Sequence, residues 1–400
     1  MEGCPTGRGG SCYVKAKDYG TSLFFFLGFC LTFFPASAWA VEHVHFRHRG
    51  EERNEEGRII LETPEGLALE ARDGQFYVIK QENIMERTSD EIPFAPYSKA
   101  EMMERLREEF PKNKGFYLIE YDPFIVVYTT SRPFANWFGG LFRRLHEQYA
   151  VYWKRNGVEL SKPEFPLVAV VLSSEERYRQ YAQQEGVKLS KGQCAFYHKL
   201  TNRIAMYDMS GEQAFQEGNQ HMATAADIQR FLAHPNSLSN IRVVIHEAVH
   251  QVGYNTGMHS RHAPNPVWLC EGLAILHEVP DLKNRFGWTP GPHVNYYRLA
   301  HLRQYLGKPH RESPILKMIQ DDDLFRTPDS ALDNYALAWG LTYFLVKKHP
   351  KELVAYLKIL QEKMPDSDDS KEIRINDFES CFGDDGEKLH KEFYEFVRKL

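Results

Sequence analysis

The sequence is poor in cysteine, which limits the ways in which its fold can be stabilised. Six cysteines occur in 400 residues, and only three of them follow residue 40: Cys194, Cys270 and Cys381. Three cysteines form at most one internal disulfide and leave one thiol over. The sequence therefore excludes the disulfide framework of small secreted domains and indicates a hydrophobic core of ordinary size.

The sequence also lacks an excess of positive charge and any internal repeat. Its net charge is −5, which argues against a nucleic-acid partner. No segment recurs at the periods that are typical of solenoid proteins. Hydrophobic residues make up 42% of the chain and charged residues 26%, which is the composition of a globular protein with room for two or three domains.

Long apolar runs are absent except for "SLFFFLGFCLTFF" at residues 22–34. This run follows a weakly basic segment and precedes "PASAWA", in which Ala38 and Ala40 are the small residues that a signal peptidase requires. Its length is well below the roughly 20 residues that a transmembrane helix needs. We therefore predict a signal peptide over residues 1–40, cleaved near Ala40, and a secreted protein, periplasmic or extracellular, without stable membrane insertion. An uncleaved anchor is the alternative.

Charged segments and short β-rich runs follow the leader. The segment "HVHFRH" at residues 43–48 is interpreted as part of a solvated, poorly ordered start of the mature chain, and a weak metal-binding tract is the alternative. Residues 41–92 are predicted to contain a small β module, because β-rich runs alternate with the turn sequences "PEG" and "DG". Residues 93–114 are predicted to be a linker and a helix, in which Ser98 and Glu101 form a capping box.

Residues 115–400 are predicted to form one larger domain that begins with strands. Two strands are expected in "GFYLIEYDPFIVVYTT" and one in "PLVAVVLS", with the helix "FANWFGGLFRRLHEQYAVYWKRNG" between them. Ser173 and Glu176 are expected to cap the next helix. The segment "CAFYHKLTNRIAMYD" is typical of a β-hairpin whose turn lies near Thr201 and Asn202.

Helical patterns dominate the rest of the chain. One helix is predicted at about 240–256, and a helical part is predicted at about 266–400, with helices near Trp268, Tyr335 and Lys388. The predicted fold class is therefore α+β, with a sheet-bearing N-terminal half and a helical C-terminal half.

The segment "IRVVIHEAVHQVGYNTG", residues 241–257, places polar side chains in an otherwise apolar helix. His246 and His250 are four residues apart, so they lie on one helical face and can present two imidazole nitrogens to one metal ion. Glu247 is turned about 100° from His246 by the helical period, so it lies beside the ion, where it can hold a water molecule. This HExxH spacing is typical of a zinc hydrolase, although a pair of core histidines would have the same spacing.

A third ligand is needed to complete such a site. The extended pattern HExxHxxGxxH does not continue here, because Thr256 stands where its last histidine would be. His259 and His262 lie close by as substitutes, while a second helix, "NPVWLCEGLAILHE", offers Glu271. Two histidines and one glutamate would leave the fourth position of a zinc ion free for water. Cys270, next to Glu271, is interpreted as a small buried residue and not as a ligand.

The segments "HEAVH" and "WLCEGLAILHE" resemble those of the gluzincin metallopeptidases, in which a glutamate from a second helix completes the zinc site. From about residue 115 to the end, the chain also resembles the exported bacterial DUF1570 family, a group described as metallopeptidases. The matching pieces are "FYLIEYDPFIVVYTTS", "HEAVHQVGYNTGM", "PVWLCEGLAILHE", "YALAWGLTYFL" and "CFGDDGEKLHKEFYEF". The resemblance implies a zincin-like catalytic domain over residues 115–400.

The resemblance also implies a role for each site residue. His246, His250 and Glu271 would bind Zn²⁺, and Glu247 would be the general base. Glu278, two helical turns after Glu271, would orient a zinc-bound histidine, unless it is a surface carboxylate. Tyr335 would stabilise the oxyanion, unless it is an aromatic residue packed on a helix.

The chain departs from the aminopeptidase branch of the gluzincins at two points. Ala336 and Leu337 replace the charged pair that usually follows the tyrosine, and the amine-binding motif GxMEN is absent, which disfavours exopeptidase activity. We therefore predict a secreted zinc metallopeptidase that acts on a peptide or protein substrate. The hairpin around residues 194–207 is either the edge along which such a peptide lies or a purely structural element. The alternative function is a catalytically inactive zincin-like module that binds an extracellular or cell-envelope partner.

Overall fold

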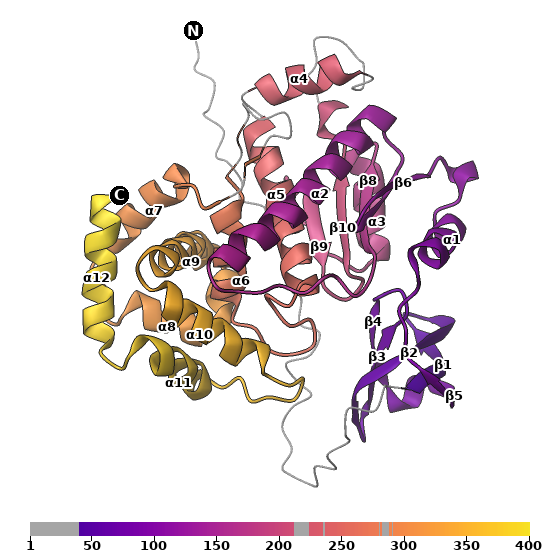
Figure 1. The fold of residues 1–400 in the computed structure, drawn as a ribbon, viewed down its shortest axis with the longest axis horizontal. Coiled ribbons are helices and arrows are strands. Elements are labelled where there is room, and N and C mark those ends of the chain that lie inside the picture. The colour runs from indigo at the N-terminus through magenta and orange to yellow at the C-terminus, as the bar shows by residue number, and fades with distance from the viewer. Residues whose placement is uncertain (1–39, 212–223, 235–236, 280, 282–287, 290) are drawn as a thin grey trace.

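The computed structural model describes residues 40–211, 224–234, 237–279, 281, 288–289 and 291–400 (Figure 1). The predicted signal peptide at residues 1–40 lies almost wholly outside these residues. The chain contains two separate five-stranded sheets followed by a group of helices. The predicted α+β fold class, with a sheet-bearing N-terminal half and a helical C-terminal half, is confirmed. Among the helices described, none combines the length and the apolarity that a bilayer span requires.

The first sheet contains the first five strands in the order β4-β3-β2-β1-β5, with all neighbours antiparallel. Its strands are β1 Ala40–His48, β2 Glu51–Thr63, β3 Gly66–Ala71, β4 Phe76–Lys80 and β5 Ile84–Pro93. They enclose a small apolar core of their own, which includes Val44, Phe46, Leu69 and Ile79. Strands β1 and β4 bury alternating side chains, whereas β3 is buried along its whole length.

The prediction of a poorly ordered segment at residues 43–48 is wrong, because these residues lie in β1 between β2 and β5. Val44 and Phe46 point into the small core, while His43 hydrogen-bonds through Nε2 to Asp90 of β5 at 2.9 Å. His43, His45 and Arg47 alternate with the apolar residues and have acidic partners on neighbouring strands. The charged side chains that suggested a solvated terminus therefore lie on the outward face of β1, a central strand of the sheet.

Helix α1, Lys99–Glu109, joins the two sheets, and the capping box predicted at its start is confirmed. The Ser98 hydroxyl accepts from the backbone N–H of Glu101, and the Glu101 carboxylate accepts from the N–H of Ser98 at 2.7 Å. These bonds satisfy two of the N–H groups that a helix start leaves unpaired.

The second sheet has the order β6-β7-β8-β10-β9 and positions the candidate site. Its strands are β6 Tyr117–Tyr121, β7 Phe124–Tyr128, β8 Leu167–Leu172, β9 Ala195–His198 and β10 Arg203–Tyr207. The three central strands run parallel and are buried on both faces, whereas β6 and β9 are antiparallel edges. The predicted strands around Asp122 and Pro123 and the predicted hairpin with its turn near Thr201 and Asn202 are confirmed.

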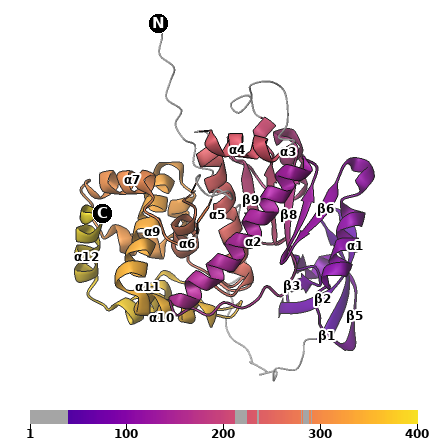
Figure 2. The ribbon, with the colours of Figure 1, turned by 45° about the horizontal axis from the view of Figure 1, so that its top comes forward.

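Helices pack against this sheet and then form the C-terminal group (Figures 1 and 2). Those near the sheet are α2 Arg132–Arg155, α3 Glu175–Gln184, α4 Ala225–Ala233 and α5 Ser237–Asn255. The N-cap of α3 is Ser174, which accepts from the N–H of Arg177, so the predicted cap at Ser173 with Glu176 is wrong by one residue. The Ser173 N–H is instead bonded to the Thr129 hydroxyl, a partner distant in sequence.

The C-terminal helices surround α9, which packs against α6, α7, α8, α10 and α12. Their bounds are α6 Val267–His277, α7 Tyr296–Leu306, α8 Pro314–Gln320, α9 Pro328–Lys348, α10 Pro350–Gln361, α11 Lys371–Phe382 and α12 Gly386–Lys399. Helices α6, α9 and α12 correspond to the three predicted here, while α7, α8, α10 and α11 were not distinguished within the predicted helical part. Helix α9 begins at Pro328, so Tyr335 lies within it and not at its start.

A buried carboxylate links the first sheet to the loop between α5 and α6. Glu70 of β3 is 1% exposed and accepts from Arg261 at 3.1 Å, His262 at 2.8 Å and Arg58 at 2.9 Å. Burial raises the pKa of Glu70, but these cationic partners outweigh it and hold the pKa at about 2. The carboxylate is therefore ionised, and its contacts attach the first sheet to the segment that separates the two helices of the site.

Candidate metal centre

Helix α5 is held against the second sheet by buried amide side chains. Gln251 is fully buried, and its Nε2 donates to the carbonyl oxygens of Val168 in β8 at 3.1 Å and of Asn202 in the hairpin turn at 2.7 Å. Asn202 and Asn255 also hydrogen-bond through their side-chain amides. Because such buried groups lose much free energy when unpaired, these bonds fix the position of α5 relative to the hairpin.

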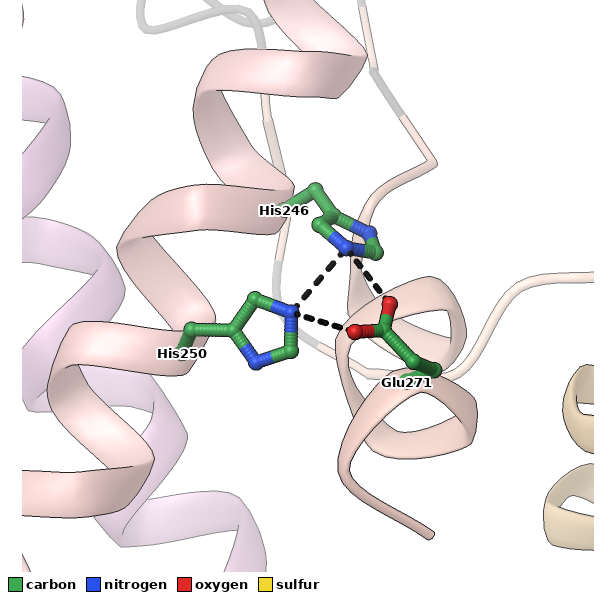
Figure 3. Close-up of side chains that lie close together, drawn as sticks. All are labelled: His246, His250 and Glu271. Atoms are coloured by element: carbon green, nitrogen blue, oxygen red, sulfur yellow. Dashed lines mark hydrogen bonds and ion pairs between the residues drawn. The ribbon is translucent and has the colours of Figure 1, made fainter. Parts of the chain in front are cut away.

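Helix α6 is positioned by its close approach to α9 at Gly272. A Cβ atom at this residue would lie 2.7 Å from the carbonyl oxygen of Ala338 and would overlap the side chain of Thr342. A larger residue would push the helices apart, so the glycine permits the contact that holds α6 in place. The preceding residue, Glu271, is then directed toward α5 (Figure 3).

Figure 3 shows that the side chains of His246, His250 and Glu271 converge on one point. The two Nε2 atoms are 3.1 Å apart, His246 Nε2 is 3.1 Å from Glu271 Oε2, and His250 Nε2 is 3.5 Å from Glu271 Oε1. Two ligands at 2.0–2.1 Å from a tetrahedral zinc ion are about 3.3 Å apart. The separations of the three donor groups therefore match those of a zinc site.

The hydrogen bonding of His246 supports the same conclusion. Its Nδ1 lies 2.9 Å from Glu278 Oε2, and because a carboxylate only accepts, Nδ1 carries a hydrogen. In the neutral ring, Nε2 then presents a lone pair to the carboxylate of Glu271 and to the second imidazole. Three acceptors at this separation repel one another unless a cation, either a proton or a metal ion, lies between them. The donor set thus fits a divalent cation.

The pKa shifts of His246 and Glu271 reflect the attraction between these two groups. Burial lowers the pKa of His246, but hydrogen bonds with Glu271 and Glu278 outweigh it and hold the pKa well above its ordinary value. Burial raises the pKa of Glu271, but the two histidines outweigh it and hold that pKa well below its usual range. The buried carboxylates of Glu271 and Glu278 therefore favour a positive charge where the side chains meet, and either a proton on His246 or a metal ion supplies it.

Glu278 lies behind His246, on the side away from the other two donors. The carboxylate is 3% exposed, and its second oxygen accepts from the Asn295 side chain at 3.1 Å. The chain of bonds from Asn295 through Glu278 to His246 fixes the orientation of the imidazole ring. Glu278 is thus buried at the site, and its contacts are those expected of an orienting group and not of a surface carboxylate.

Glu247 is 4% exposed and accepts from the backbone N–H of Tyr197 in β9 at 2.8 Å. Its carboxylate lines the same cavity as the three donor groups but does not belong to the triad. Burial raises the pKa of Glu247, although the two histidines oppose this shift. The hydrogen bond places the glutamate between helix α5 and the edge strand of the second sheet.

Tyr335 lies on the wall of the same cavity, and its side chain is 8% exposed. Its ring packs edge-to-face on Phe325 with centroids 5.2 Å apart, and the guanidinium of Arg298 lies 5.7 Å from the ring centroid. The tyrosine is therefore both packed against neighbours and open to the cavity.

The substitute ligands considered from the sequence lie elsewhere. His262 bonds to Glu70, and His259 Nδ1 lies 3.6 Å from Cys270 Sγ. Burial lowers the pKa of His259 to about 3, which keeps this ring neutral. Cys270 is buried, as expected, and accepts from the Tyr254 hydroxyl at 3.5 Å. Cys194, Cys270 and Cys381 are free thiols.

Several residues of the site were not found from the sequence. Asn295 supports Glu278, Gln251 anchors α5, and Lys199, Tyr254 and Asp322 line the cavity. Each is separated by many residues from the ligand helix or lacks a recognisable motif, so no local pattern identifies it. Only Gln251 could have been found from the sequence, because it is a polar residue directly after His250 in an otherwise apolar helix.

One family model matches the part of the chain that contains the candidate site. A family model described as "Protein of unknown function (DUF1570)" matches residues 240–366, a segment that contains every candidate site residue from His246 to Tyr335. No curated protein was found to match the chain. The resemblance of residues 115–239 and of the C-terminal end to this family stays a prediction. Over residues 240–366, the chain is similar to the DUF1570 family.

Proposed function

We propose that this protein is an exported zinc-dependent metallopeptidase of the gluzincin type. The observation that carries the proposal is the convergence of His246, His250 and Glu271 at the separations of a tetrahedral zinc site. Zinc supplies Lewis acidity, which makes water a nucleophile at neutral pH and polarises a carbonyl group. The leader-like sequence before residue 41 supports the export of the protein.

Residues around the metal would transfer protons, orient a ligand and bind the substrate. Glu247 would take the proton of the attacking water and deliver it to the leaving amine, since its carboxylate opens into the cavity beside the ligands. Glu278 would hold His246 in the orientation that ligation needs. The edge strand β9 would bind the substrate backbone, because it borders the cavity through Tyr197 and is the outermost strand of its sheet among the described residues.

The proposal is tested on the purified mature protein. Elemental analysis is expected to give one zinc ion per chain, and digestion of an unbiased peptide library is expected to give cleavage that a chelator stops and added zinc restores. Cleavage that persists after complete metal removal would contradict the mechanism. Zinc binding without any cleavage would favour the alternative, an inactive zincin-like module that binds an extracellular or cell-envelope partner.

Tyr335→Phe is expected to lower kcat by roughly 10²-fold with little change in KM, because an oxyanion donor acts mainly in the transition state. Phenylalanine keeps the ring contact with Phe325, so a purely packing role predicts an unchanged kcat. Tyr343→Phe is the matched control, since Tyr343 is a buried tyrosine of the same helix that does not line the cavity. Steady-state kinetics on one cleaved peptide separates the two roles.

A further inference from the structure

Lys199 brings a positive charge into the wall of the candidate site. It directly follows β9 and lines the same cavity as His246, His250 and Glu271. Its Nζ atom lies 5.1 Å from the ring centroid of Tyr254, whose hydroxyl bonds to the thiol next to Glu271. The amine is therefore close to the ligand helix α6, although it is not one of the ligands.

The other charged side chains around Lys199 already have partners. Asp322 pairs with Arg374 at 2.7 Å, Arg326 pairs with Asp323 at 2.8 Å, and Arg261 pairs with Glu70 at 3.1 Å. No carboxylate of the described residues forms an ion pair with Lys199. Within that part of the chain, its charge faces the cavity without a counterion.

The ionisation of Lys199 and the charge balance of the cavity favour an anionic ligand. Burial lowers the pKa of Lys199 to about 8, so most of the amine stays protonated at neutral pH. The carboxylates of Glu247 and Glu271 would balance the two charges of a zinc ion, while Glu278 does not line the cavity and lies near the guanidinium of Arg298. The charge of Lys199 would then remain, in a site where exclusion of water strengthens ionic contacts.

We propose that Lys199 determines specificity by binding a carboxylate group of the peptide substrate. This inference rests on the proposed peptidase activity. The carboxylate belongs either to an aspartate or glutamate side chain near the scissile bond or to the C-terminus of the peptide. Both sources present the same planar anion to the amine, so the two are distinguished by the choice of substrate.

The experiment measures kcat/KM for matched peptides that the full-length mature enzyme cleaves. One series exchanges glutamate for glutamine at each position around the scissile bond, and the other exchanges a free C-terminal acid for an amide. The wild-type enzyme is expected to prefer the carboxylate form in one series by about 10-fold or more, because truncating one partner of a desolvated ion pair costs at least this much. The series that shows the preference identifies the source of the carboxylate.

Lys199→Met is expected to bring this preference ratio close to one, and Lys199→Arg is expected to retain it. The matched control is Lys191→Met, which removes an exposed lysine from the segment before β9 and should leave the ratio unchanged. Cleavage without carboxylate preference in the wild type, or an unchanged ratio in Lys199→Met, overturns the inference and leaves the peptidase proposal intact. Absence of cleavage of every peptide overturns both.

Discussion

Glu247→Gln is expected to lower kcat/KM for peptide hydrolysis by roughly 10²–10⁴-fold while the protein keeps one zinc ion per chain. The amide of glutamine cannot accept a proton from water. Its carbonyl oxygen can still accept the Tyr197 N–H that Glu247 binds at 2.8 Å. The substitution therefore removes the base and preserves the contact between α5 and β9.

Three measurements check this prediction: initial rates on a cleaved peptide, zinc content and thermal unfolding. Glu147→Gln is the matched control, because Glu147 is an exposed carboxylate on α2 with only a weak contact to Arg143. The control is expected to keep both zinc and activity. Unchanged turnover in Glu247→Gln would reject the assigned role of the glutamate, whatever the zinc content.

Glu271→Gln is expected to weaken zinc binding by more than about 100-fold, since changes even to groups behind the ligands cost 10–100-fold. An amide carries no charge to balance the cation, and its oxygen is a weaker metal ligand than a carboxylate oxygen. Glu271 is also the only carboxylate in the triad, so its loss leaves two neutral imidazoles. Competition against a fluorescent zinc chelator measures the affinity directly.

Thermal unfolding provides a second measurement of the same effect. A ligand that binds only the folded state raises the melting temperature as its concentration rises above Kd. Zinc is therefore expected to stabilise the wild-type protein and to have little effect on Glu271→Gln. Glu147→Gln is again the control, because its carboxylate is exposed on α2 and lies outside the triad. Retention of tight zinc binding by Glu271→Gln would contradict the proposed ligand set.

The sequence was informative where a local pattern determines the structure. The four-residue spacing of His246 and His250 directs both rings to one side of a helix, and the structure brings Glu271 to the same point. The capping box at Ser98 is equally local, because Ser98 and Glu101 bond to each other. The hairpin turn at Asn202 is also local, because asparagine tolerates the left-handed backbone that the turn uses.

Contacts between distant segments could not be predicted in this way. Asn295, at the start of α7, bonds to Glu278 across 17 residues of sequence. Lys199 lines the cavity because it directly follows the edge strand β9. The prediction for residues 43–48 was wrong for a related reason, since the acidic partners of His43 and His45 lie on other strands. The composition of a segment does not reveal which distant residues it contacts in the fold, and the roles of Asn295, Lys199 and residues 43–48 depend on those contacts.

The ionic contacts of Glu70 make the first sheet a structural support of the metal centre. Arg261 is buried, and it lies in the connection that sets the spacing between the two helices carrying the donor groups. A fragment that began at residue 115 would leave this guanidinium without its carboxylate, and an uncompensated buried charge is strongly destabilising. The smallest portion of the chain able to keep the ligands in register therefore extends upstream to include strand β3.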